Sequence, residues 1–162
     1  MTPSPASDPF VGRARELAVL TEALETAIGG HGGIVTVSGE AGIGKTRLAE
    51  KLSQQAEARD AETLWGRCHE EGGAPSYWPW VRAVRSHVLA TTEDRLHKEL
   101  GTSAALLGTV LPEITTRFKG AKYQPVAEES AEQTRFRLFD AFTTFLGNAA
   151  SNRPIVLFLD DL

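Results

Sequence analysis

Apolar and polar residues alternate along the first third of the chain in a pattern that predicts a helix, a strand and a second helix. Between residues 13 and 28 apolar side chains recur every three or four positions, which is the period of an amphipathic helix. A glycine-rich stretch ends this helix, and the short β-branched run at 34–37 predicts a buried strand. Leu48, Leu52 and Ala56 then share one face of the second helix.

The middle of the chain predicts one strand followed by several helices. Residues 62–66 have the pattern of a weaker strand. Pro79 stands near the start of the next helix, where the missing N–H donor of proline costs nothing. Three valines form the buried stripe of this helix: Val81, Val84 and Val88. Glycine or proline divides the region 91–118 into shorter helices, at Gly101, Gly108 and Pro112.

The last third predicts a long helix and a final strand. The helix covers about residues 129–149, and an apolar stripe expected in the core marks it: Phe136, Phe139, Phe142, Phe145 and Leu146. Residues 155–159 form a continuous apolar run, which is typical of a strand buried on both faces. Strands that alternate with helices favour a parallel sheet flanked by helices, so the expected fold class is α/β.

Length, charge and cysteine content exclude several classes of protein. The 162 residues suffice for one domain, expected over 10–162 after a flexible, proline-rich leader at 1–9. The 17 basic and 21 acidic residues give a net charge of −4, whereas modules that bind nucleic acid or membrane surfaces need a basic excess. Cys68 is the single cysteine and cannot form an internal disulfide, which favours a cytoplasmic protein. No targeting or membrane-spanning segment is predicted.

One segment carries a specific chemical signature, the sequence GEAGIGKT at 39–46, which matches the phosphate-loop pattern G-x-x-x-x-G-K-[ST] in full. Glycines let backbone N–H groups turn toward phosphate oxygens at the positive start of the following helix. The expected nucleotide-binding residues are Gly39, Glu40, Ala41, Gly42, Ile43, Gly44, Lys45 and Thr46. Lys45 reaches the β and γ phosphates, and the Thr46 hydroxyl ligates Mg²⁺. The alternative is a glycine-rich turn that contains Lys-Thr by chance, but the predicted strand before it and helix after it favour the phosphate loop.

The final strand ends in two acidic residues, the pattern of a Walker B segment. A buried parallel strand delivers its terminal carboxylate to the carboxyl edge of the sheet, so Asp160 is expected to hold Mg²⁺. Asp161 is the candidate catalytic residue, since it could orient or deprotonate the attacking water. Such a strand on its own is usually followed by a solvated turn. Its position after the phosphate loop in the chain favours the functional interpretation.

Further stretches resemble one group of P-loop ATPases. They are FVGRxxE at 10–16, GRC at 66–68, YWPW at 77–80 and RFRLFD at 135–140. With the two Walker segments, they make the chain similar to the N-terminal AAA-like ATPase domain of bacterial STAND signalling proteins, which occurs in large LuxR-type transcriptional regulators and beside adenylate cyclase domains. The resemblance implies a P-loop NTPase fold, ATP and Mg²⁺ as cofactors, and a role as a nucleotide-dependent switch with self-association or effector domains as partners.

The resemblance also implies which residues lie beside the base, namely Val11, Gly12 and Arg13. The family pattern often has glutamate directly after the arginine, where this chain has Ala14. The alternative for Arg13 is a solvated arginine at the start of a helix. Family members continue into a further strand and a lid, so the resemblance implies a partial domain, truncated after the Walker B strand and weakly active by itself.

Two other functions remain open at the level of sequence. One is a P-loop kinase that transfers phosphate to a small molecule, and the other is a nucleotide-dependent interaction module without turnover. The aromatic residues Trp65, Tyr77, Trp78 and Trp80 are expected in a core or a subunit contact rather than in a base-stacking platform. Packing is also expected for Cys68 and His69, and the other histidines have no paired group at a useful spacing: His31, His87 and His97.

Overall fold

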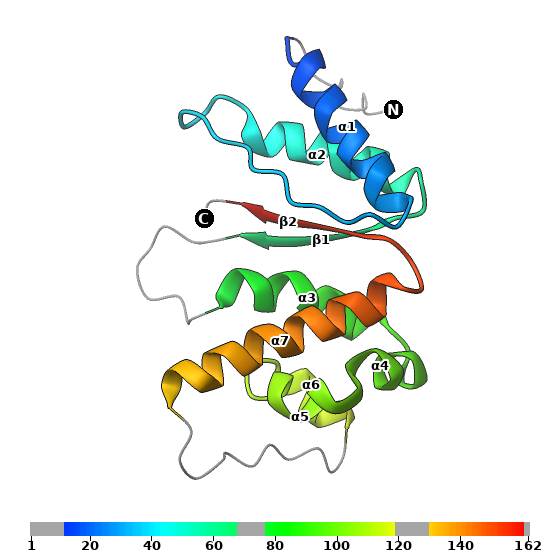
Figure 1. The fold of residues 1–162 in the computed structure, drawn as a ribbon, viewed down its shortest axis with the longest axis vertical. Coiled ribbons are helices and arrows are strands. Elements are labelled where there is room, and N and C mark those ends of the chain that lie inside the picture. The colour runs from blue at the N-terminus through cyan, green and yellow to red at the C-terminus, as the bar shows by residue number, and fades with distance from the viewer. Residues whose placement is uncertain (1–11, 68–76, 119–129, 161–162) are drawn as a thin grey trace, which may run out of the picture. The chain divides into compact units, whose positions relative to one another are not determined.

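The computed structural model describes residues 12–67, 77–118 and 130–160. The chain divides into two compact units, residues 1–59 and residues 60–162. Each unit is described by itself below. Figure 1 shows the elements of both units in chain order, coloured from the N-terminus to the C-terminus.

The first unit contains the two helices that the sequence predicts, α1 (Ala14–Ile28) and α2 (Lys45–Glu57). Their buried apolar residues are those of the predicted stripes: Leu20, Leu24, Leu48, Leu52 and Ala56. Polar contacts join the two helices, since the Thr21 hydroxyl donates a hydrogen bond to Gln55 Oε1 at 2.8 Å. Arg59 Nε, just after α2, lies 2.5 Å from Glu25 Oε1 on α1.

The predicted buried strand at 34–37 is wrong. The structure assigns no strand to these residues, and Ile34 is 97% exposed, Val35 48% and Val37 41%. A strand exists only when a neighbouring strand satisfies its backbone N–H and C=O groups. Among the described residues the two strands of the second unit pair with each other and not with this segment. The β-branched composition favours an extended backbone but does not specify a partner.

The second unit begins and ends with the two strands of a parallel sheet, β1 (Glu62–Arg67) and β2 (Ile155–Asp160). The register runs from Glu62 opposite Ile155 to Arg67 opposite Asp160, so both strands end at the same edge. The prediction of parallel strands at these positions is confirmed, and the two-stranded sheet with its helices is consistent with an α/β fold. Figure 1 shows α3 lying along one face of this sheet.

Close packing of α3 on β1 depends on Gly66. A Cβ atom built at this position would lie 2.1 Å from the backbone oxygen of Pro79, in the first turn of α3. No side chain fits in that space, so glycine is required where the helix meets the strand. Leu64, on the same side of β1, is 1% exposed. The start of α3 is therefore held against the carboxyl end of β1.

The helices of the second unit confirm the predicted pattern of one helix, several short ones and a long one. They are α3 (Trp78–Ala90), α4 (Glu93–Leu100), the 3₁₀ turn η1 (Gly101–Ser103), α5 (Ala104–Leu107), α6 (Pro112–Arg117) and α7 (Ala131–Ala150). A capping box starts α7: the backbone N–H of Gln133 donates to Ser130 Oγ at 3.2 Å, and Gln133 Oε1 accepts from the Ser130 N–H at 2.8 Å. The helices share one apolar core, whose fully buried members include Val84, Val88, Leu96, Leu107, Ile114 and Phe145.

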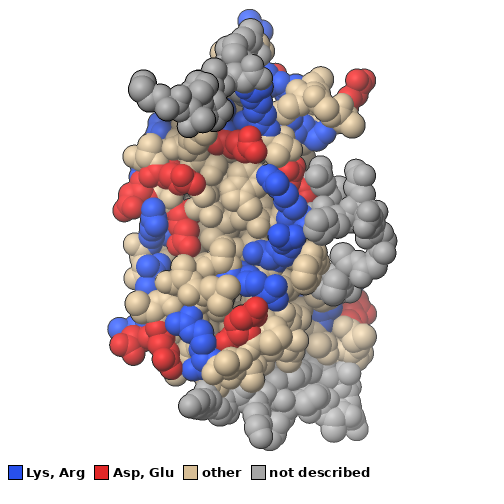
Figure 2. Space-filling model, turned by 180° about the vertical axis from the view of Figure 1, so that it is seen from behind, with Lys and Arg blue, Asp and Glu red and all other residues tan. Residues whose placement is uncertain are grey.

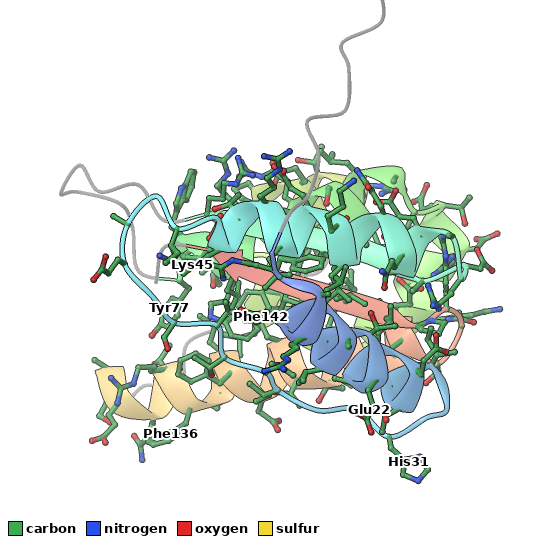
Figure 3. The ribbon with its side chains drawn as sticks, turned by 90° about the horizontal axis from the view of Figure 1, so that it is seen from above. Glu22, His31, Lys45, Tyr77, Phe136 and Phe142 are labelled. Atoms are coloured by element: carbon green, nitrogen blue, oxygen red, sulfur yellow. The ribbon has the colours of Figure 1, made fainter. Side chains whose placement is uncertain are left out.

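The predicted apolar stripe of α7 is only partly buried. Phe142 and Phe145 lie in the core, whereas Phe136 is 61% exposed and Phe139 42% exposed. Phe136 stands nine residues before Phe145, which is about two and a half turns at about 3.6 residues per turn, so the two side chains lie on opposite sides of the helix. Figure 3 shows Phe136 and Phe142 projecting from different sides of α7. The prediction that Phe136 and Phe139 belong to the core is wrong.

Candidate functional site

The phosphate-loop motif forms an exposed turn that leads into α2. Gly42 and Gly44 have φ angles of +76° and +95°, in the left-handed region that glycine adopts without strain. The turn is closed by a hydrogen bond of 3.4 Å from the Ile43 N–H to the Glu40 oxygen. Gly44 is the N-cap of α2 and has no side chain that could cap the helix. The N–H groups at a helix start are donors that bind phosphate groups.

Lys45 is folded back over this turn. Its Nζ donates to the backbone oxygen of Gly39 at 3.0 Å and to that of Glu40 at 3.1 Å. Figure 3 shows Lys45 at the beginning of α2. The ammonium group thus lies over the backbone of the loop, at the place where the motif predicts phosphate oxygens. Residues 39–43 are all exposed, so a ligand can reach the loop from solvent.

Arg13 contacts the same loop from outside the motif. Its Nη2 donates a hydrogen bond of 2.7 Å to the backbone oxygen of Ile43. The residue stands directly before α1, where it is the N-cap, and 30 residues separate it from its acceptor. Arg13 is therefore a contact of the phosphate loop. The sequence-based alternatives of a base-side residue and a solvated arginine did not include this contact.

Of the other predicted site residues, the structure describes Gly12 and Thr46 but not Val11 and Asp161. Gly12 is exposed and has a φ of +92°, and Thr46 lies in the first turn of α2 with intermediate exposure. Val11 lies outside the described residues, as does Asp161 of the second unit.

The predicted metal ligand Asp160 is the last residue of β2, at the carboxyl edge of the sheet. Its side chain is 13% exposed, and its Oδ2 lies 3.9 Å from Nε of Arg67, the residue opposite on β1. Two residues earlier in each strand, the rings of Trp65 and Phe158 stack with centroids 4.3 Å apart and an interplanar angle of 16°. The guanidinium of Arg67 lies 5.5 Å from the centroid of the Trp65 ring. The carboxylate thus has a cation and an aromatic pair beside it.

The chemistry of these donors suits a magnesium nucleotide. Mg²⁺ is usually bound by one or two protein oxygens together with phosphate oxygens and water. The Thr46 hydroxyl of the first unit and the Asp160 carboxylate of the second unit are both oxygen ligands of this kind. A site made of protein side chains alone would need more ligands. In the described part of the chain, no group of three or more histidine, cysteine, aspartate or glutamate side chains could hold a metal ion.

Sequence analysis missed a buried polar cluster in the second unit, which we call the His87 cluster and which consists of Glu62, His87, Arg95 and Glu99. His87 Nδ1 lies 2.7 Å from Glu62 Oε1, and His87 Nε2 lies 2.7 Å from Glu99 Oε2. Arg95 Nε donates to Glu99 Oε1 at 2.6 Å. His87 is 2% exposed and Glu99 1%. The cluster joins β1, α3 and α4, and its only sequence signal was a histidine on the buried stripe of α3.

The distribution of surface charge and the apolar character of the helices also bear on the sequence-based expectations. Figure 2 shows acidic and basic side chains mixed over the face that it draws, in keeping with a net charge of −4. Within the described ranges, no helix has the length and apolar character needed to cross a membrane.

Comparisons with known proteins agree with the loop chemistry. The family described as AAA ATPase domain matches residues 9–162. The chain is 30% identical over 168 residues to the hybrid signal transduction histidine kinase G of Dictyostelium discoideum, which takes in 96% of this chain and 5% of that protein. It is 30% identical over 60 residues to an uncharacterised protein of Rhizobium meliloti, which takes in 37% of this chain and 6% of that protein. No solved structure matches significantly. The chain thus spans a small part of the length of these curated relatives.

Proposed function

The chain belongs to the AAA ATPase domain family, and on that premise we propose that it binds ATP with Mg²⁺ and acts as a nucleotide-dependent switch in a signalling protein. The observation that carries the proposal is the loop at 39–46, with Lys45 lying over its backbone and Gly44 as the N-cap of α2. These are the parts that cradle the phosphates of a nucleotide.

In the proposed site, each residue has one role. The N–H groups of the loop and the Lys45 ammonium bind the phosphates, and the Arg13 contact with Ile43 holds the loop in shape. Thr46 and Asp160 hold Mg²⁺, which neutralises phosphate charge and orders the attacking water when bound. Asp161 orients or deprotonates that water. Val11 and Gly12 contact the base, as the resemblance to STAND ATPases implies.

The proposed setting is a cytoplasmic regulator, with the ATPase segment linked to effector domains. Two lines support a signalling role: the resemblance to STAND domains of LuxR-type regulators, and the name of one relative, a hybrid signal transduction histidine kinase of which the match covers 5%. Contacts with the γ-phosphate would favour one arrangement of the protein, and hydrolysis would release it.

Nucleotide competition and phosphate release test the proposal. We expect ATP and ADP to compete for one site on the 162-residue chain and GTP to bind more weakly, because the resemblance to STAND ATPases implies an adenine site. Equal affinities for ATP and GTP would contradict an adenine site. Absence of any nucleotide binding would contradict the proposal as a whole.

Steady-state phosphate release separates the proposed ATPase from its two rivals. Release that does not depend on an added acceptor supports an ATPase. Transfer that requires a small-molecule acceptor supports a kinase, and tight binding without release, in this chain and in the full-length protein, supports an interaction module.

A further inference from the structure

The pairing of Asp160 with Arg67 suggests how the charge of the Asp160 carboxylate is compensated when no metal ion is bound. We propose that Arg67 is a positioning residue, whose guanidinium neutralises the Asp160 carboxylate in the metal-free protein and gives it up to Mg²⁺ when the magnesium nucleotide binds. This inference rests on the proposed function, because it concerns the same Mg²⁺ site.

Sheet register puts the two side chains together. Arg67 and Asp160 are opposite each other at the last pair of a parallel ladder, with Nε and Oδ2 3.9 Å apart. Side chains alternate between the two faces of a strand. Because Leu64 and Gly66 face α3, Arg67 lies on the other face, and the register puts Asp160 on that face too.

The aromatic pair below them fixes this arrangement. Trp65 and Phe158 stack across the two strands one pair earlier on the same face, with ring centroids 4.3 Å apart. The Arg67 guanidinium lies 5.5 Å from the centroid of the Trp65 ring, close enough for a cation–π contact. Arg67 is therefore held between the ring and the carboxylate by the strands themselves.

The two side chains differ in exposure, and this difference shows which of them needs the other for charge compensation. The Asp160 side chain is 13% exposed, whereas that of Arg67 is 52% exposed. A carboxylate withdrawn from water needs a compensating cation nearby. The Arg67 guanidinium keeps contact with water, whereas the Asp160 carboxylate, at the end of β2, is largely withdrawn from it.

Mg²⁺ and the guanidinium compete for the same carboxylate charge. Mg²⁺ ligation requires a carboxylate oxygen at about 2.0 to 2.1 Å, and a guanidinium within about 4 Å of that oxygen repels the ion. By thermodynamic linkage, the contact with Arg67 weakens Mg²⁺ binding by the same factor as Mg²⁺ weakens the contact. Removal of the Arg67 charge should therefore tighten metal binding.

The experiment titrates metal onto the 162-residue chain at a fixed concentration of a non-hydrolysable ATP analogue. Bound Mn²⁺ is measured from the loss of the EPR signal of the free ion, and Mg²⁺ from the rise in thermal unfolding temperature. R67Q should lower the metal concentration at half-saturation about two- to fivefold, the scale of a partly exposed ion pair. R67K, which keeps the charge, should stay close to the parent.

Two controls make the result specific. K98Q removes the same charge from an exposed position on α4 and should leave the metal titration unchanged. In a D160N background, R67Q should no longer shift the titration, because its effect acts through the Asp160 carboxylate.

The outcomes separate this inference from the proposed function. Without metal-dependent nucleotide binding in the parent, both fall. If the parent binds the metal nucleotide but R67Q leaves the half-saturation concentration unchanged or raises it, the role of Arg67 is wrong while the function stands. If R67Q instead weakens nucleotide binding in chelator, Arg67 contacts the phosphates directly, and the positioning role is likewise overturned.

Discussion

The phosphate loop and the His87 cluster are both built from charged and polar groups, but they lie in opposite environments. In the loop, Lys45 contacts two backbone oxygens in an exposed turn. In the cluster, His87 lies between Glu62 and Glu99 with 2% of its surface exposed. The first arrangement leaves its donors accessible to a ligand, whereas the second uses its donors to satisfy other buried groups.

The difference shows where polar contacts stabilise the fold and where they serve binding. Exposed charge contacts contribute about 0 to 1 kcal/mol, so the loop can lose its contacts to a ligand at little cost in stability. Removing one partner of a buried charged pair costs about 3 to 5 kcal/mol, because the other charge stays buried without compensation. Substitutions in the loop should therefore change binding, and substitutions in the cluster should change stability.

The largest effect is expected from His87→Leu. This change removes the hydrogen bonds that His87 makes with Glu62 and with the buried Glu99, and it leaves Glu99 with Arg95 as its remaining partner in the cluster. We expect the free energy of unfolding to fall by about 3 kcal/mol, measured by urea denaturation, because buried polar groups lose their hydrogen-bond partner. The stabilisation by nucleotide of the protein that remains folded should be unchanged.

His97→Leu is the matched control, since His97 is exposed on α4 and its ring packs 4.7 Å from that of Phe118. It should change the free energy of unfolding by about 0.5 kcal/mol or less. Equal losses in the two variants would show that the His87 cluster is no more important than a surface ring contact.

Lys45→Ala should have the converse effect. ATP at 100 times its dissociation constant should stabilise the parent chain by about 2.7 kcal/mol, and the variant should lose this stabilisation. Without nucleotide, its free energy of unfolding should stay within about 0.5 kcal/mol of the parent, because the contacts of Lys45 are exposed.

Lys51→Ala tests whether loss of any lysine of α2 weakens nucleotide binding. Lys51 lies further along the same helix, where its Nζ contacts Gln54 Oε1 at 3.2 Å. The nucleotide-induced shift in this variant should equal that of the parent. If nucleotide stabilised Lys45→Ala as much as it stabilises the parent, the assignment of residues 39–46 as a phosphate loop would be wrong.

Arg13→Gln should give the smallest effect. Loss of the hydrogen bond to Ile43 should weaken nucleotide binding by about 1 kcal/mol, or about fivefold, in isothermal titration. If Arg13 positions the loop, ATP and inorganic tripolyphosphate should lose affinity equally. A loss confined to ATP would instead identify a base contact. Arg15→Gln, at an exposed position on α1, should change neither affinity.

Sequence alone predicted the loop and both parallel strands because each signal is local. The motif at 39–46 is contiguous, and the apolar run before Asp160 indicates a strand that ends in an acidic residue. The His87 cluster gives no local signal, since Glu62 and Glu99 stand 25 and 12 residues from His87. Only the packing of α3 between β1 and α4 brings these groups together.

The two wrong expectations have the same origin. The run at 34–37 has strand composition, yet composition cannot name a pairing partner. Phe136 has the hydrophobicity of a core residue, but it stands on the wrong side of α7. Both errors concern tertiary contacts, namely which strand a segment pairs with and which side of a helix faces the core. The preferences of single residues do not contain that information.

The close approach of Gly66 to Pro79 also has a consequence for protein engineering. A Cβ atom at position 66 would meet backbone atoms of Pro79 and not the end of a flexible side chain, so a larger residue would fit only if α3 moved away from β1. A library of variants of this chain should therefore keep glycine at position 66.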